Sequence, residues 1–152
     1  AVFDNGHNCR SRNDDVFKIK DNYDLVYIDT PYMNNQGGSV DYHDFYHFLE
    51  GLTIYPKWVD YIDYNSKHHR LRPLHSVWND RDAIHQAFQK LFNKFRESII
   101  VVSYRNDGMP SEEEHVDMLK QIKRKVTLVR YGHYKYVLSK NTGSKEVLLI
   151  GE

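Results

Sequence analysis

Several classes of protein are excluded by what this sequence lacks. No apolar run approaches about 18 residues, and no charged segment followed by an apolar one opens the chain, so neither a membrane span nor a secretion leader is predicted. Cys9 is the single cysteine, which excludes an internal disulfide framework and is typical of the reducing cytosol. We therefore expect a cytoplasmic protein with no membrane partner.

An excess of charge of one sign is also lacking. The 21 basic and 21 acidic residues cancel, so any binding to nucleic acid must come from a local patch rather than from the whole molecule. Tyrosine, by contrast, is abundant with 12 copies, and it serves hydrophobic cores and wet binding surfaces equally well. A length of 152 residues is enough for a proper core, and we expect residues 1–152 to form a single domain.

The apolar pattern predicts an α/β fold. Short apolar segments at 25–28 and 98–103 are typical of strands that are buried on both faces. Between them, an amphipathic helix at 84–95 repeats apolar residues at spacings of three and four, with Asp80 or Asp82 as its cap. Strand, helix and strand in this order predict a parallel crossover.

Other elements complete this prediction. A helix at about 42–52 is expected to bury one face, formed by Phe45, Phe48, Leu49 and Leu52. Residues 53–79 show no period and are expected to form a long loop rich in aromatic and basic side chains.

The C-terminal third is predicted to close the sheet with antiparallel strands. A capping box, Ser111-x-x-Glu114, opens another helix, and a strand follows at 126–131. Residues 134–139 and 146–150 are expected to form a hairpin at one edge of the sheet. The fold class expected from the sequence is therefore a mostly parallel α/β sheet with an antiparallel edge hairpin.

The strongest chemical signal is Asp24-Leu-Val-Tyr-Ile-Asp-Thr-Pro-Tyr32, because open α/β sheets bind ligands outside the carboxyl ends of their strands. Pro31 holds its own φ and pushes Thr30 towards an extended backbone, which fixes the direction of the Thr30 carbonyl. The Asp29 carboxylate and that carbonyl are two acceptors suited to an NH2 group, and Tyr32 offers a ring for stacking a flat heterocycle. The pattern favours alkyl transfer to an exocyclic amine; the alternative is an ordinary strand exit with a solvated Asp29.

This segment resembles the catalytic Asp-Pro-Pro-Tyr motif of adenine-specific (N6) DNA methyltransferases of the DNA adenine methylase type. The resemblance covers most of the chain and continues through residues 40–52, 101–108 and 145–150. It implies a Rossmann-like methyltransferase sheet, S-adenosylmethionine as the methyl donor, and double-stranded DNA from which an adenine is extruded.

The resemblance also assigns roles to the residues of the motif. Asp29 and the carbonyl of Thr30 would bind the adenine amine, Pro31 would stiffen the turn, and Tyr32 would stack on the flipped base. Asp15 and Val16, together with Asp29, would lie at the cofactor. For Asp15 a second interpretation stays open, in which Asp14 and Asp15 cap a short helix.

Two departures from the family pattern matter. Thr30 replaces the first proline of the motif, which reduces rigidity but keeps the backbone carbonyl. The Phe-x-Gly-x-Gly cofactor loop is missing, since only Gly6 precedes the motif. Because the chain also begins at Ala1, we expect the C-terminal part of an enzyme, inactive alone and lacking its N-terminal cofactor-loop strands. A missing N-terminal segment or a second chain would then cover the free edge of strand 25–28.

Two further groups of residues each allow a functional and a structural interpretation. Basic side chains with the sign and spacing for phosphate contacts are Lys67, His68, His69, Arg70 and Arg72, although a solvated loop explains them as well. Ser103 and Tyr104 end a strand and point at the same crevice, although a serine at such a position more often only caps the turn.

A metal site is the other possibility weighed. His43 and His47 stand at helical spacing and imitate a zinc helix, yet no third ligand is evident, so we expect surface histidines and no metal. The competing functions are therefore a nucleic-acid-binding methylase relic without catalysis and a histidine-based metallohydrolase.

Overall fold

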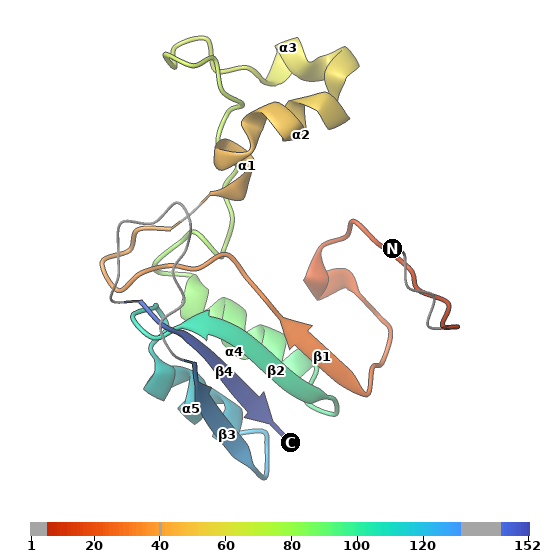
Figure 1. Ribbon diagram of the computed structural model, residues 1–152, viewed down its shortest axis with the longest axis vertical. Coiled ribbons are helices and arrows are strands. Elements are labelled where there is room, and N and C mark those ends of the chain that lie inside the picture. Colours follow the sequence, from red (N-terminus) through yellow and green to blue (C-terminus); the bar gives the residue numbers. More distant parts are fainter. Residues whose placement is uncertain (1–5, 40, 132–143) are drawn as a thin grey trace.

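The body of the protein is a four-stranded sheet in the order β1-β2-β4-β3. The computed structural model describes residues 6–39, 41–131 and 144–152. The strands are β1 (Leu25–Ile28), β2 (Ile99–Arg105), β3 (Val126–Arg130) and β4 (Glu146–Gly151). Two helices, α4 (Ile84–Lys94) and α5 (Glu112–Lys120), lie together behind this sheet (Figure 1). The mixed α/β class expected from the sequence is therefore confirmed.

The predicted parallel crossover is present. β1 leads through α4 to β2, and β1 pairs with β2 in parallel, with Ile28 opposite Val102. The predicted aspartate cap of α4 is wrong, because Ala83 is at the N-cap position and no side chain caps the helix; Asp80 Oδ1 instead accepts the backbone N–H groups of Asp82 and Ala83 in the preceding turn. The capping box is confirmed as well, since Ser111 and Glu114 exchange side-chain and backbone hydrogen bonds at the start of α5.

The antiparallel part of the sheet differs from the prediction. β4 was expected in an edge hairpin with residues 134–139, but it lies inside the sheet and pairs antiparallel with both β2 and β3. Two of the three pairings are therefore antiparallel, although β1, β2 and β3 run in one direction. Residues 134–139 lie outside the described residues. Strand order depends on contacts between distant segments, which local periodicity does not encode.

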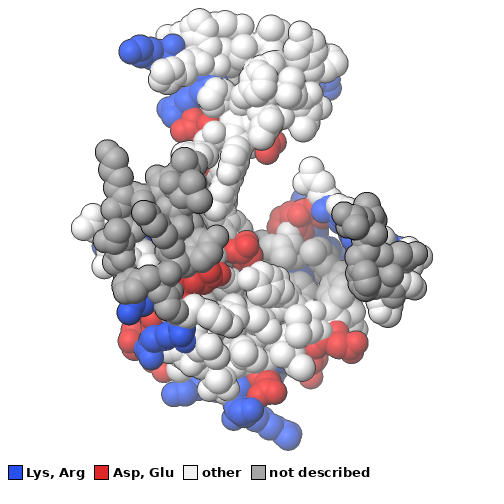
Figure 2. Space-filling model, viewed as in Figure 1, with Lys and Arg blue, Asp and Glu red and all other residues white. Residues whose placement is uncertain are grey.

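The two faces of the sheet have different surroundings. On the face that α4 and α5 cover, the buried strand side chains are Ile28, Ile100, Val102, Tyr104, Val147 and Leu149. On the other face Leu25 and Tyr27 are 53% and 56% exposed. Figure 2 shows this open face as a largely uncharged surface. Within the described residues, β1 pairs on one side only, so its other edge is free.

A lobe formed by residues 41–72 protrudes from the body (Figure 1). It contains α1 (Tyr42–Phe45), α2 (His47–Thr53), the 3-10 helix η2 (Tyr55–Lys57) and α3 (Trp58–Tyr61). Its interior is small: of residues 41–72 only Gly51 and Leu71 are buried. Gly51 is needed because a Cβ there would lie 2.4 Å from the Trp58 ring.

The prediction of a single helix at 42–52 is therefore wrong in two respects. It breaks at Tyr46 into α1 and α2, and the face expected to be buried is exposed. Those exposed apolar side chains are Phe45, Phe48, Leu49 and Leu52. The region 53–79 also contains short helices, where a loop was expected. Across the described ranges, no helix combines the length and apolarity needed to cross a membrane.

Candidate active site

The predicted motif forms a turn directly after β1. Asp29 is exposed at the end of the strand, whereas Thr30, Pro31 and Tyr32 are half-buried. The Tyr32 hydroxyl donates to Asp29 Oδ1 at 3.0 Å. The Tyr32 ring, expected to be free for stacking, packs against Tyr104 in an edge-on contact with centroids 5.3 Å apart. Asp29 and Tyr32 are thus close together, but in this state they bind each other.

Ser103 joins this turn from the neighbouring strand. Its Oγ lies 3.1 Å from the Tyr32 hydroxyl and donates to Glu146 Oε1 at 2.7 Å. Ser103 is only 1% exposed and lies within β2, so it does not cap a turn. Sequence reasoning missed Glu146, because its approach to Ser103 follows from the β2–β4 register, in which Glu146 is opposite Arg105.

Tyr104 fixes the segment that follows the motif. Its hydroxyl accepts the backbone N–H of Met33 at 3.2 Å and donates to the carbonyl of Met109 at 2.6 Å. Burial raises the pKa of Tyr104 to about 12, so the hydroxyl keeps the hydrogen that it donates. Residues 33–39, glycine-rich in sequence, are ordered by a bridge between Met33 and Ser39. The motif is therefore followed by a clamped segment.

A cavity of about 470 Å³ lies along the free edge of β1 and reaches the motif, a size typical of small-molecule sites. Both Val16 and Asp29, two of the three residues expected at the cofactor, line it. The Thr30 hydroxyl is buried and has no hydrogen-bond partner among the described residues. Most other lining side chains are apolar, and they include Ile19, Pro31, Trp78, Leu91 and Phe95.

Asp15 is placed differently from Val16. Its carboxylate accepts the backbone N–H of Phe17 at 2.9 Å and caps the 3-10 helix η1 (Val16–Lys18). The capping interpretation is therefore seen in the structure, and Asp15 is not among the residues that line the cavity. Its cofactor role stays a prediction.

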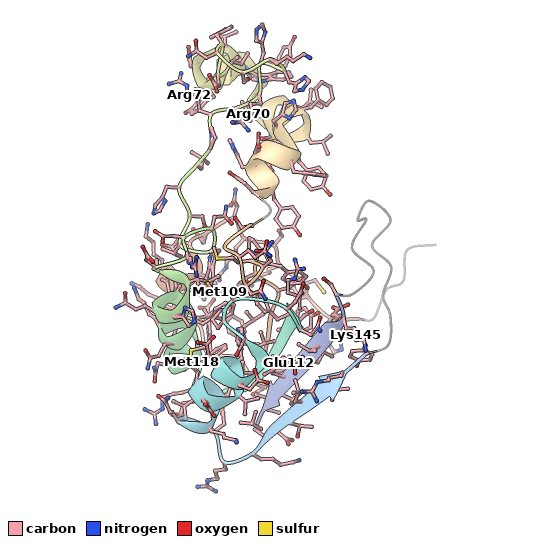
Figure 3. The ribbon with its side chains drawn as sticks, turned by 90° about the vertical axis from the view of Figure 1, so that its left-hand side faces the viewer. Arg70, Arg72, Met109, Glu112, Met118 and Lys145 are labelled. Atoms are coloured by element: carbon pink, nitrogen blue, oxygen red, sulfur yellow. The ribbon has the colours of Figure 1, made fainter. Side chains whose placement is uncertain are left out.

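The five basic residues predicted to contact DNA all lie in the lobe, away from the turn at Asp29. Residues 61–72 form a hairpin-like loop, with Lys67, His68 and His69 exposed near its tip. Arg70 and Arg72 both make contacts to other residues of the lobe (Figure 3): Arg70 pairs with Asp44 at 2.7 Å, and the exposed Arg72 donates to the carbonyl of Asp60.

The histidine pair does not form a metal cluster. His43 belongs to α1 and His47 to α2, and His47 Nδ1 contacts the Asp44 carbonyl at 3.1 Å. The described part of the chain contains no group of three or more His, Cys, Asp or Glu side chains able to hold a metal ion. Nothing in this geometry adds support to the metallohydrolase alternative.

Comparison with known proteins gives three related methyltransferases. Type II methyltransferase M2.HphI of Haemophilus parahaemolyticus is 31% identical over 156 residues, which are 99% of this chain and 41% of that protein. Modification methylase StsI of Streptococcus sanguinis is 26% identical over 97% of this chain and 22% of that protein. Type II methyltransferase M.FokI of Planomicrobium okeanokoites is 34% identical over 64% of this chain and 14% of that protein.

These similarities confirm the methyltransferase resemblance carried by the sequence. The chain spans less than half the length of each of these relatives. No protein-family model matches the chain, and no solved structure matches it either.

Proposed function

We infer from the relationship of this chain to the type II methyltransferases that it is the motif-bearing part of a DNA methyltransferase of a restriction-modification system. The enzyme methylates the exocyclic N6 amine of adenine in double-stranded DNA. The observation that carries this proposal is the exposed Asp29 at the carboxyl end of β1, beside a turn carbonyl, a tyrosine and a cavity.

The residues of the turn have different roles in the proposed reaction. An amine on an aromatic ring is a poor nucleophile, because its lone pair is delocalised into the ring. Asp29 and the carbonyl of Thr30 accept the two amine hydrogens, which favours a pyramidal nitrogen with its lone pair directed outward. Tyr32 then stacks on the extruded base, which requires its hydroxyl to leave Asp29.

The cavity along β1 fits S-adenosylmethionine in size and chemistry. Its apolar walls, with the rings of Trp78 and Phe95, suit a nucleoside, and the Thr30 hydroxyl and the Asp29 carboxylate suit its polar atoms. When bound there, S-adenosylmethionine supplies the activated methyl group. The free edge of β1 is where a Rossmann-like methyltransferase sheet would continue with further strands, from another segment of the enzyme or a second chain.

The side chains that contact DNA from the lobe are those that are not used in ion pairs or hydrogen bonds within the lobe. Lys67 and His68 are exposed near the tip of the loop, whereas Arg70 and Arg72 hold the lobe together. Lys67→Glu in the full-length enzyme is expected to weaken DNA binding and to lower the slope of log affinity against log salt by about 1 or more. Arg10→Lys, in the segment before η1, is the charge-preserving control. Equal salt slopes for the unaltered enzyme and both variants would contradict a DNA contact of Lys67.

The product of the reaction tests the proposal. Full-length enzyme, S-adenosylmethionine with a labelled methyl group and duplex DNA are incubated, and the nucleosides are separated after digestion. We expect the label in N6-methyladenine. Label in a methylated cytosine would overturn the substrate assignment, and salt-dependent DNA binding without any label would favour the non-catalytic relic.

A further inference from the structure

Four side-chain oxygens form a continuous chain through the site. Asp29 Oδ1 accepts the hydrogen of Tyr32 at 3.0 Å, the Tyr32 oxygen lies 3.1 Å from Ser103 Oγ, and Ser103 donates to Glu146 Oε1 at 2.7 Å. The chain thus crosses from the end of β1 over β2 to β4. It has a carboxyl group at each end and hydroxyl groups in the middle.

The row of four oxygens has more oxygen–oxygen contacts than hydroxyl hydrogens to fill them. Each hydroxyl carries one hydrogen, and an ionised carboxylate carries none. When both carboxyl groups are ionised, two hydrogens serve the three contacts that Tyr32 and Ser103 make with each other and with Asp29 and Glu146. Because Ser103 donates to Glu146 and Tyr32 donates to Asp29, the contact between the two hydroxyl oxygens has no hydrogen of its own.

An amine that binds Asp29 resolves this shortage. Where its N–H takes Asp29 Oδ1, the Tyr32 hydrogen turns to Ser103 Oγ, which lies 3.1 Å away. Every contact that remains then has its own hydrogen: Tyr32 to Ser103, and Ser103 to Glu146. We propose that Ser103 and Glu146 are positioning residues for Tyr32, which hold its hydroxyl and so release Asp29 to the amine of the substrate base.

The placement of Ser103 and Glu146 suits such a role. Ser103 is almost fully buried in β2 and is paired with Leu148 of β4, so its Oγ has little freedom to move. Glu146 lies at the start of β4, diagonally across the ladder from Ser103, and orients the serine hydrogen away from Tyr32. The oxygen of Ser103 is thereby kept as an acceptor.

A double-mutant cycle in the full-length enzyme tests this inference, which rests on the proposed function. Ser103→Ala leaves the Tyr32 hydroxyl on Asp29, where it competes with the base, so KM for DNA is expected to rise about tenfold. Glu146→Ala removes the acceptor that orients the Ser103 hydrogen and is expected to act the same way. Ser103→Thr keeps the hydroxyl and is expected to restore KM.

The decisive arm is the Tyr32→Phe background, where no hydroxyl is left to compete. There Ser103→Ala is expected to change KM by less than about twofold, because the two residues act as one unit. If Ser103→Ala costs about the same with and without the Tyr32 hydroxyl, its role is structural and the inference is overturned. An unchanged KM in Ser103→Ala itself overturns it as well.

A second readout and two controls separate the possible failures. With 2-aminopurine at the target position, weaker base capture in Ser103→Ala is expected to leave the probe stacked and its fluorescence low. Ser98→Ala, at an equally buried serine just before β2, is expected to behave like the unaltered enzyme. If Asp29→Ala keeps full activity, the proposed function fails; if Asp29→Ala is inactive while Ser103→Ala is unaffected, only this inference fails.

Discussion

The two faces of the same sheet are built from adjacent residues, yet they have opposite environments. Along β2, Ile100, Val102 and Tyr104 are buried under α4 and α5. On the other face Ile99 is 40% exposed and Val101 is half-buried, and only Ser103, beside Tyr32, is buried there. Apart from Ser103 both sets are apolar, so composition does not distinguish them. The difference is the presence of a helical layer on one face and its absence, within the described residues, on the other (Figures 1 and 2).

The comparison shows where the stability of the chain comes from. Full burial of a single large apolar side chain stabilises a fold by about 1.5–3 kcal/mol. The covered face has a whole cluster of such side chains, with Phe88 in contact with Trp78, Phe92, Tyr104 and His115. An open apolar face contributes little by itself, and it is the surface on which a further layer of the enzyme would pack.

The largest expected effect concerns a histidine under the covered face. His115 is fully buried between Phe88 and Tyr104, and this burial lowers its pKa from 6.5 to about 4. Between pH 6.5 and pH 4 the unfolded chain therefore binds a proton that the folded chain does not, so the free energy of unfolding falls as the pH falls. Over the whole window this one group accounts for about 3 kcal/mol.

Urea denaturation at pH 7 and at pH 4.5 measures this contribution. In His115→Leu the part of the pH dependence due to the imidazole is removed, and the difference between the two proteins isolates it from the carboxyl groups that titrate nearby. A variant that loses as much stability on acidification as the unaltered protein would show that His115 is not the cause.

A smaller effect comes from a matched pair of valines on opposite faces of β2. Val102 is fully buried under the helices, and Val101 is half-buried on the open face. Val102→Ala is expected to lower the free energy of unfolding by about 2 kcal/mol, and Val101→Ala by less than about 1 kcal/mol. Equal losses in urea denaturation would mean that both faces are packed, contrary to the comparison.

Much of the fold was predictable because its elements have strong local signals. The periodicity of residues 84–95 identified α4, the capping box identified α5, and the apolar run identified β2. The helix expected at 42–52 failed because a period indicates that a helix has an apolar face but not that a partner exists to cover it. The internal position of β4 depends on pairing with two strands distant in sequence.

The residues of the candidate site also differ in whether a local sequence signal predicts them. Asp29 and Tyr32 were located by the strand-to-turn motif, which is contiguous in sequence. Glu146 was not found, since it reaches Tyr32 only through Ser103 and the register of β2 with β4. The DNA contact expected of Arg70 stays a prediction, and its ion pair with Asp44 was not foreseen because it joins residues that are far apart in sequence and has no local signal.

The central claim is that the Asp29 carboxylate receives the amine of the target base. Its most direct test is kcat/KM for DNA methylation by the full-length enzyme carrying Asp29→Ala, against Asp24→Ala, an exposed carboxylate just before β1. We predict a loss of at least about a hundredfold for Asp29→Ala and a change of less than about twofold for Asp24→Ala. Equal kcat/KM values in the two variants, with both proteins folded, would contradict the account.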